Sequence, residues 1–353
     1  MTPITTRHPA LLAGLLAAFA LPGLSIADEQ PAAMDHSAHQ AGHEGHKMEP
    51  WMYEALRKRV DIYRTATDAY IDNSMVQMGP DYMSYLSGPD VHGKAGVVVL
   101  AHGFGKVGDE AFRQGLKPVA AHYPLAVAFG MSMTSSAHIQ AAIDKLTATG
   151  AETIVMVPAL SSSASDDQLR QWQYMFGLTN DPGYLETKRI VTDRKVVWTP
   201  ALEDHPLVID MIADNARELS KDPANEVVII VSHGPTLDAD NAKNLALLGR
   251  IASALKKKDG YSDVMFMSMQ NDAVPEVRKA NGTKLRGMVE DANKAGKRVI
   301  IVTNLQSPRS IQQQVEDDIK GTQYVFNTRG LVQHPNYAKW VDTIVGETLA
   351  AAK

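Results

Sequence analysis

Apolar runs alternate with amphipathic stretches through most of the chain from residue 93 onward. The runs VVVLA, PLAVAFG, TIVMVP and KVVWTP have the length and β-branched content of buried strands. Between them, apolar residues recur at helical spacing in segments of about ten to fifteen residues. Strands that alternate with such helices form βαβ units around a parallel sheet. We therefore expect an α/β fold with parallel sheets.

The same succession then starts a second time. The segment EVVIIVSHGPT repeats GVVVLAHGFG, and each of the next three predicted strands also has a later counterpart. His102 and His205 are 103 residues apart, and their counterparts His233 and His334 are 101 residues apart. Two signals in the same order at nearly the same distance indicate an internal repeat. We predict two homologous halves, residues 95–222 and 223–353, each of ordinary domain size.

The N-terminal region differs in composition from these halves. Residues 1–27 carry Arg7 and His8 ahead of an apolar run, and the small residues Ser25 and Ala27 follow it. This is the pattern of a cleaved signal peptide, so we expect an exported, periplasmic protein. The later segments are not apolar enough to span a membrane, so we expect no transmembrane segment after cleavage.

Residues 28–50 contain almost no large apolar side chain, which predicts a disordered tail. Histidines spaced by three and four residues make this tail a candidate metal-binding tract for Cu, Zn, Ni or Co: His36, His39, His43 and His46. The alternative is a solvated leader that binds metal only weakly. The pattern of residues 51–94 predicts one long amphipathic helix and a connector. This helix is a candidate surface for homo-oligomer formation, and the sequence leaves the oligomeric state open.

Composition excludes several classes of function. The chain has no cysteine, so it has no disulfide, thiolate metal site or cysteine nucleophile. A net charge of -5 argues against a nucleic-acid partner. The motif G-x-S-x-G of serine hydrolases does not occur. GFGKVG, residues 103–108, has the spacing of a dinucleotide loop, but the following strand ends in AFGMSM, without the acid that binds the ribose.

A histidine at the end of the first strand is what the two halves share. His102 follows VVVLA and His233 follows VVIIVS, each just before a glycine. In open α/β sheets, ligands bind at the carboxyl ends of the strands. We therefore expect both histidines at the mouth of a cleft.

These residues resemble a known family. LAHG at 100–103 and IDKLTATGAETIVMVP at 143–158 are similar to the sirohydrochlorin cobaltochelatase and ferrochelatase superfamily, the class II tetrapyrrole metallochelatases. The resemblance covers residues 95–353. It implies two Rossmann-like halves that face each other across a cleft, where a metal-free tetrapyrrole receives Co or Fe. It also implies that His102 is the metal ligand and His233 its copy.

The chain departs from this family at two positions. The loops ALSSSASDDQ and NLQSPRSIQQQVEDD lack the second histidine that short family members carry. The family's glutamate near the end of the second strand falls at Met131 in the first half and at Met267 in the second. Three acids in the loops are candidate replacements, namely Asp166, Asp167 and Glu316.

Both second strands end in Met-Ser-Met, which places Met131 and Met133 on one face and Met267 and Met269 on one face. Thioethers beside imidazole suit Cu(I) or a haem iron. The alternative is packing, because methionine fills irregular gaps in cores.

Other polar residues have weaker signals. Ser161, Ser162 and Arg309 are candidates for contacts with tetrapyrrole carboxylates. His205 and His334 each precede proline, which favours a helix-capping role over ligation. His138 begins a predicted helix and is expected to be a surface or capping residue.

Two functions from different classes are consistent with these observations. The first is an exported chelatase with Co or Fe as a substrate and His102 as ligand and base. The second is a non-catalytic periplasmic carrier of metal or haem on the same fold. A third, a fold that mediates only protein contacts, predicts no metal binding.

Overall fold

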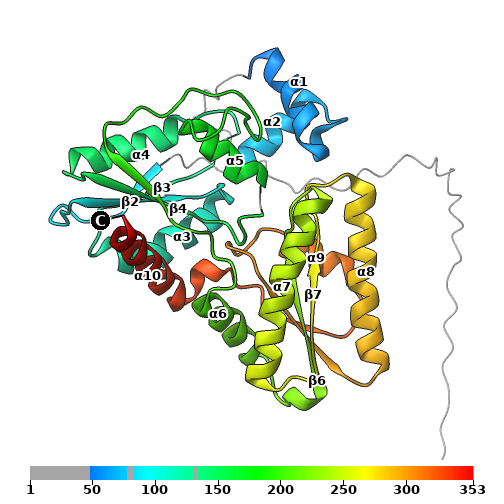
Figure 1. Cartoon of the computed structure of the whole chain (residues 1–353). Helices are drawn as coiled ribbons and strands as arrows, with labels where there is room; N and C mark the ends of the chain where they lie inside the picture. Colours follow the sequence, from blue (N-terminus) through cyan, green and yellow to red (C-terminus); the bar gives the residue numbers. More distant parts are fainter. Residues whose placement is uncertain (1–47, 78–82, 131–132, 165, 353) are drawn as a thin grey trace, which may run out of the picture. The chain divides into compact units, whose positions relative to one another are not determined.

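The computed structural model describes residues 48–77, 83–130, 133–164 and 166–352. The chain from residue 46 onward forms one compact unit. The predicted signal peptide, residues 28–47 of the predicted tail with its four histidines, and Met131 lie outside the described residues, whereas Pro50, the last residue of that tail, begins the first helix. Figure 1 shows the arrangement of the helices and strands.

The first sheet has five strands in the order β1-β3-β2-β4-β5. Strands β2, β3, β4 and β5 are mutually parallel, and only β1 runs antiparallel, along β3. β2 is central and fully buried beyond its first residue, with Val98 paired to Ala126 and Met156. The strands are β1 (Met83–Tyr85), β2 (Ala95–Leu100), β3 (Leu125–Ala128), β4 (Thr153–Pro158) and β5 (Lys195–Trp198).

The second sheet has four parallel strands in the order β7-β6-β8-β9. Its order, second-first-third-fourth along the chain, matches that of the four parallel strands in the first sheet. The predicted α/β class with parallel sheets is confirmed. The strands are β6 (Glu226–Ser232), β7 (Asp263–Ser268), β8 (Arg298–Thr303) and β9 (Val325–Phe326).

Amphipathic helices cover the sheets. In α3, Phe112, Leu116 and Val119 are fully buried, which is the helical spacing that the sequence shows. The helices that follow β2 are α3 (Gly105–Ala120), α4 (Ala137–Ala148), α5 (Asp166–Met175), α6 (Pro206–Arg217), α7 (Asp238–Asp259), α8 (Pro275–Lys294), α9 (Gln312–Asp318) and α10 (Pro335–Ala351), with short 3-10 turns η2 (Pro223–Asn225) and η3 (Leu331–Gln333).

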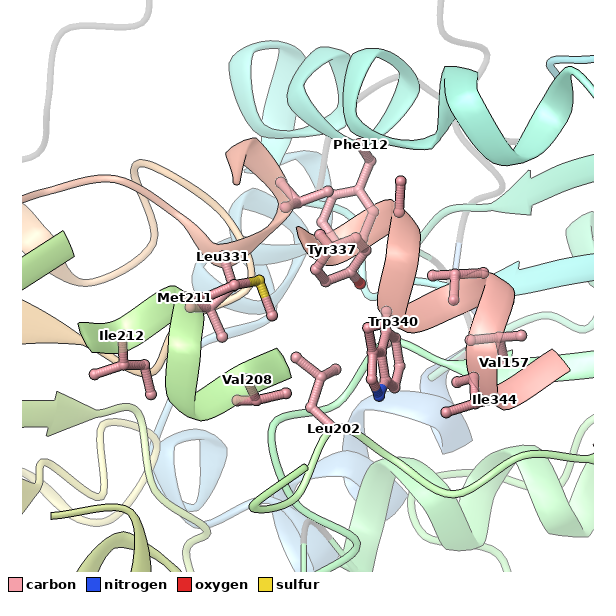
Figure 2. Close-up of a cluster of buried hydrophobic side chains, with 14 of the residues drawn as sticks. Phe112, Val157, Leu202, Val208, Met211, Ile212, Leu331, Tyr337, Trp340 and Ile344 are labelled. Atoms are coloured by element: carbon pink, nitrogen blue, oxygen red, sulfur yellow. The ribbon is translucent and has the colours of Figure 1, made fainter. Parts of the chain in front are cut away.

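The last helix of each predicted half packs on the other half. α10 lies against α3, β4 and β5, whereas α6 lies against α7 and β8. The two helices also contact each other, and one apolar cluster runs through both regions. Figure 2 shows side chains of this cluster from distant parts of the sequence, among them Phe112, Val157, Leu202, Val208, Met211, Tyr337 and Trp340. The predicted boundary at residues 222 and 223 is therefore not a boundary in the packing.

The N-terminal region folds as two helices instead of the predicted single one. α1 (Pro50–Arg59) ends where Val60 adopts an extended conformation, and the turn η1 (Asp61–Tyr63) leads to α2 (Asp68–Gln77). The side chain of Arg57 donates to the carbonyl oxygen of Ala66 at 2.8 Å and so closes the turn. The break lets apolar residues of both helices enter one cluster with two residues of the first sheet's loops, Met133 and Leu185.

Within the described part of the chain, every helix is too short or too polar to cross a bilayer.

Candidate metal and tetrapyrrole site

Each of the two repeated histidines lies where a central strand ends. His102 follows β2 by two residues, and His233 follows β6 directly. Gly103 (φ 88°) and Gly234 (φ 78°) next to them both adopt left-handed backbone conformations. A side chain at residue 234 would also collide with the hydroxyl of Ser268. The shared His-Gly pair is thus a turn that requires glycine and presents the histidine at the sheet edge.

The GFGKVG segment serves packing as well. A Cβ atom on Gly108 would collide with Ser307 Oγ and with the side chain of Phe104. Gly108 is therefore needed where α3 approaches the loop after β8. This accounts for the glycine without a bound dinucleotide.

The two histidines influence each other electrostatically. Burial lowers the pKa of His102, and the nearby His233 lowers it further, while the carboxylate of Asp272 and a backbone hydrogen bond at Gly103 oppose this shift. The influence of His233 and Asp272 on the pKa of His102 requires that all three are close together. The lowered pKa leaves His102 as a neutral imidazole near pH 7, which is the form that binds metal or accepts a proton.

Asp272 is a member of the site that the sequence analysis missed. Its Oδ1 lies 3.8 Å from Nε2 of His233. It belongs to the loop between β7 and α8, where the sequence reads QNDAVP. The available signal was an acid just beyond the end of a parallel strand, whereas the position of the family's glutamate falls at Met267, within β7.

Two tyrosines border Asp272. Burial is the main factor that raises the pKa of Tyr63, to about 12, and the charge of Asp272 adds to it. Burial also raises the pKa of Tyr184, with contributions from Asp167 and Asp272. Tyr63 comes from the N-terminal region, so that region reaches the histidine site.

The predicted methionine ligands have packing contacts. Met267 and Met269 are 3% and 0% exposed and lie in an apolar cluster with Leu285 and Val289 of α8. Met133 belongs to the cluster that holds the N-terminal helices. These contacts correspond to the packing alternative.

The predicted tetrapyrrole contacts are dispersed. The hydroxyl of Ser161 donates to the carbonyl oxygen of Asn304 at 3.1 Å and links the two sheets' loops. Ser162 is buried, and its hydroxyl accepts from the backbone of Ala164. Arg309 is exposed and has a left-handed backbone (φ 70°). Ser161 and Ser162 thus hold loops together, while Arg309 remains open to solvent.

The acids proposed as replacement ligands are partly engaged elsewhere. Asp167 pairs with Arg170 at 2.7 Å within α5. The charge of Glu316 acts on Tyr324, whose pKa is raised mainly by burial. The side chain of Asp166 lies outside the described residues.

Three other histidines have structural roles. The Nδ1 atom of His205 accepts from the backbone of Leu207 at the start of α6, and that of His334 accepts from Asn336 at the start of α10. The predicted capping role is confirmed for both. The prediction of a surface position for His138 is wrong, because its side chain is 0% exposed. Its helix, α4, turns this residue inward together with Ile139 and Ala142.

The site is not a preformed metal cage. Across the described ranges, no three His, Asp or Glu side chains are arranged to hold an ion without movement. A hollow of about 460 Å³ lies between the first residues of β8 and β9, with Lys297, Arg298 and Tyr324 in its lining. Because β6 and β8 are parallel, this hollow is at the opposite edge of the sheet from His233. We therefore do not associate it with the histidine site.

Comparison with known proteins shows a likeness of fold. No protein-family model and no curated protein matches the chain. The structure of SirB from Bacillus subtilis with Fe³⁺ superposes with a TM-score of 0.51 at 14% identity, over 74% of this chain and 97% of SirB. A multi-domain protein from Deinococcus radiodurans, described as structurally similar to chelatases, matches with a TM-score of 0.44 at 18% identity, over 72% of this chain and 56% of that protein.

Proposed function

We propose that the protein is a tetrapyrrole metallochelatase that inserts Co²⁺ or Fe²⁺ into a sirohydrochlorin-like macrocycle. One observation carries the proposal: His102 and His233 follow equivalent central strands of the two sheets, and the charge of His233 acts on the pKa of His102. The similarity to SirB, a structure that contains Fe³⁺, supports it at the level of the fold.

The chemistry needs no redox step. Two metal–nitrogen bonds form in the macrocycle, two pyrrole N–H bonds break, and two protons leave. Neutral His102 is suited to bind the incoming ion or to accept one of these protons. The metal is a substrate, so the donors must release it. Among the described residues, no three candidate ligands form a closed metal site. An open arrangement of this kind is consistent with release of the metal.

Turnover with a metal-free macrocycle tests the proposal. Purified protein is mixed with sirohydrochlorin and Co²⁺ or Fe²⁺, and metal insertion is monitored by the absorption of the macrocycle over many turnovers. Insertion should be faster than in the protein-free control. His102→Ala should lower this rate by about 100-fold or more, because a ligand and proton acceptor is lost. The exposed His92 provides the matched control, and His92→Ala should retain the rate.

Equal rates with and without protein, for both metals, would reject insertion into this macrocycle. A rate that is as fast in His102→Ala as in the unchanged protein would remove His102 from the mechanism. A loss in both histidine variants would indicate a general effect on folding.

A non-catalytic carrier of metal or haem is the second candidate. It is favoured by the loops after β4 and β8, which lack the histidine found in short family members. Binding of Co²⁺, Cu⁺ or haem at one equivalent without any insertion would identify this function.

We also propose, from the sequence, that the protein is exported to the periplasm and that its two halves arose by duplication. The signal-like residues 1–27 support export, and the matching strand order of the two sheets is consistent with duplication. In this proposal, the histidine tract at residues 36–46 captures metal ions outside the cytoplasm.

A further inference from the structure

The loop of Asp272 is attached on both sides. The backbone N–H of Asn271 donates to the carbonyl oxygen of His233 at 3.1 Å. The carbonyl oxygen of Asp272 accepts from the N–H of Ile62, in the N-terminal turn η1, at 3.2 Å. Asp272 is therefore held between the histidine turn and the N-terminal region.

The conformation of this loop is strained at a nearby residue. Gln270 has a φ of 43°, in the left-handed region that a residue with a side chain rarely adopts. Its buried side chain donates to the carbonyl oxygen of Thr236 at 3.2 Å, and Arg278 donates to the side chain of Asn271 at 2.8 Å. Strain of this kind persists only where surrounding contacts impose it, and it is common at functional sites.

The contacts of His233 show which of its ring nitrogens faces Asp272. Its Nδ1 lies 3.1 Å from the carbonyl oxygen of Gly234, and because a carbonyl oxygen only accepts, Nδ1 donates there. Nε2 is therefore the ring nitrogen on the side of the carboxylate of Asp272. An imidazole nitrogen and a carboxylate oxygen are both metal ligands, so a metal ion is a species that both can bind.

The separation of the two groups is suited to a metal ion. The distance of 3.8 Å between His233 Nε2 and Asp272 Oδ1 is too long for a hydrogen bond. Two ligands at about 2.1 Å from a tetrahedral ion are about 3.4 Å apart. The side chain of Asp272 is 52% exposed, so an ion from solvent can reach it. Imidazole and carboxylate together are suitable ligands for divalent iron and cobalt.

We infer that Asp272 is a direct ligand of the incoming divalent ion, paired with His233, and that it is held in place by the loop of residues 270–274. The biological purpose of this role rests on the proposed chelatase function. The binding of the ion by Asp272 can be measured without that function. The carboxylate offsets one positive charge when the ion binds, and the metal–carboxylate bond breaks when the ion passes to the macrocycle. No electron is transferred in either step.

Direct Co²⁺ binding tests this inference without any tetrapyrrole. The full chain is used with His36, His39, His43 and His46 changed to Asn, so that the tail does not contribute. In this background, Asp272→Asn should weaken Co²⁺ binding by about ten-fold or more and change the visible Co²⁺ spectrum, because a charged ligand is lost. Asp272→Glu, which keeps the carboxylate, should retain more of the affinity than Asp272→Asn.

The control makes the same charge change on the outer side of α8. Asp291 is 77% exposed and pairs with Lys294 at 3.2 Å, so Asp291→Asn should bind Co²⁺ as the background does. Unchanged affinity and spectrum in Asp272→Asn would overturn the inference, as would a background chain that binds no Co²⁺. Failure of metal insertion into sirohydrochlorin, with the Co²⁺ results as expected, would reject only the chelatase function.

Discussion

The histidines of this chain differ in role because their surroundings differ. His102 and His233 follow the ends of central strands and converge with Asp272 on one site. His205 and His334 accept backbone hydrogen bonds at the starts of α6 and α10. His138 is fully buried on the inner side of α4. Residue type alone therefore does not distinguish these roles, whereas position at a strand end, at a helix start or on a buried helix face does.

The buried His138 predicts a dependence of stability on pH. Burial lowers its pKa to about 3 in the folded protein, below an unfolded value of about 6.5. Between these values the unfolded state binds more protons, so the free energy of unfolding should fall as the pH falls from 6.5 toward 3. This residue should contribute up to about 1.4 kcal/mol per pH unit.

Denaturant unfolding at several pH values measures this effect. His138→Gln should give a flatter profile below pH 6.5 than the unchanged protein, because the group that titrates is removed. His92→Gln, at an exposed side chain, should keep the original slope. Identical slopes in all three proteins would show that His138 does not contribute.

At the scale of elements, the turns after β2 and β6 determine where the two histidines of the candidate site lie. Each central strand delivers its histidine through a glycine in a left-handed conformation. The N-terminal helices contribute as well, because η1 donates a backbone hydrogen bond to Asp272. The site therefore depends on three separate elements that are distant along the chain.

Substitution of Gly234 tests the turn after β6. Gly234→Ala should lower the free energy of unfolding by about 1–2 kcal/mol or more, since a left-handed conformation is costly for a residue with a side chain and Ser268 must move. Gly287→Ala, within α8 and with open space around the added methyl group, should raise it by about 0.5–1 kcal/mol. Thermal or denaturant unfolding measures both, and equal effects of the two changes would contradict the requirement for glycine at residue 234.

At the scale of the whole described unit, the exchange of α6 and α10 joins the two sheets. Trp340 and Tyr337 of α10 are fully buried in the cluster that also contains Phe112 of α3 and Val157 of β4. Leu331, next to α10, belongs to the same cluster, as Figure 2 shows. Neither sheet can bury its apolar face with the helices of its own half alone.

Separate expression of the predicted halves tests this exchange. Residues 48–222 and residues 223–353 should each lack a cooperative unfolding transition, because truncation of a single buried aromatic residue already costs about 3–5 kcal/mol. Residues 48–353 should unfold in one calorimetric transition, and mixing of the two halves should restore part of it. A sharp transition in either isolated half would show that the halves are independent domains.

The apolar periodicity of the sequence by itself determined the alternation of strands and helices, the α/β class and the place of His102 and His233 after central strands. These features are local, since a run of β-branched residues or a helical repeat of apolar positions can be read without knowing its partner. The His-Pro caps were predictable for the same reason.

Only the tertiary structure decided which of these local elements meet. The break between α1 and α2, the burial of His138, the exchange of α6 and α10 and the position of Asp272 beside His233 all depend on contacts between residues far apart in sequence. Periodicity shows that one face of a helix is apolar, but that face could be buried equally well against several different apolar surfaces. The choice among those surfaces is made by packing of the complete chain.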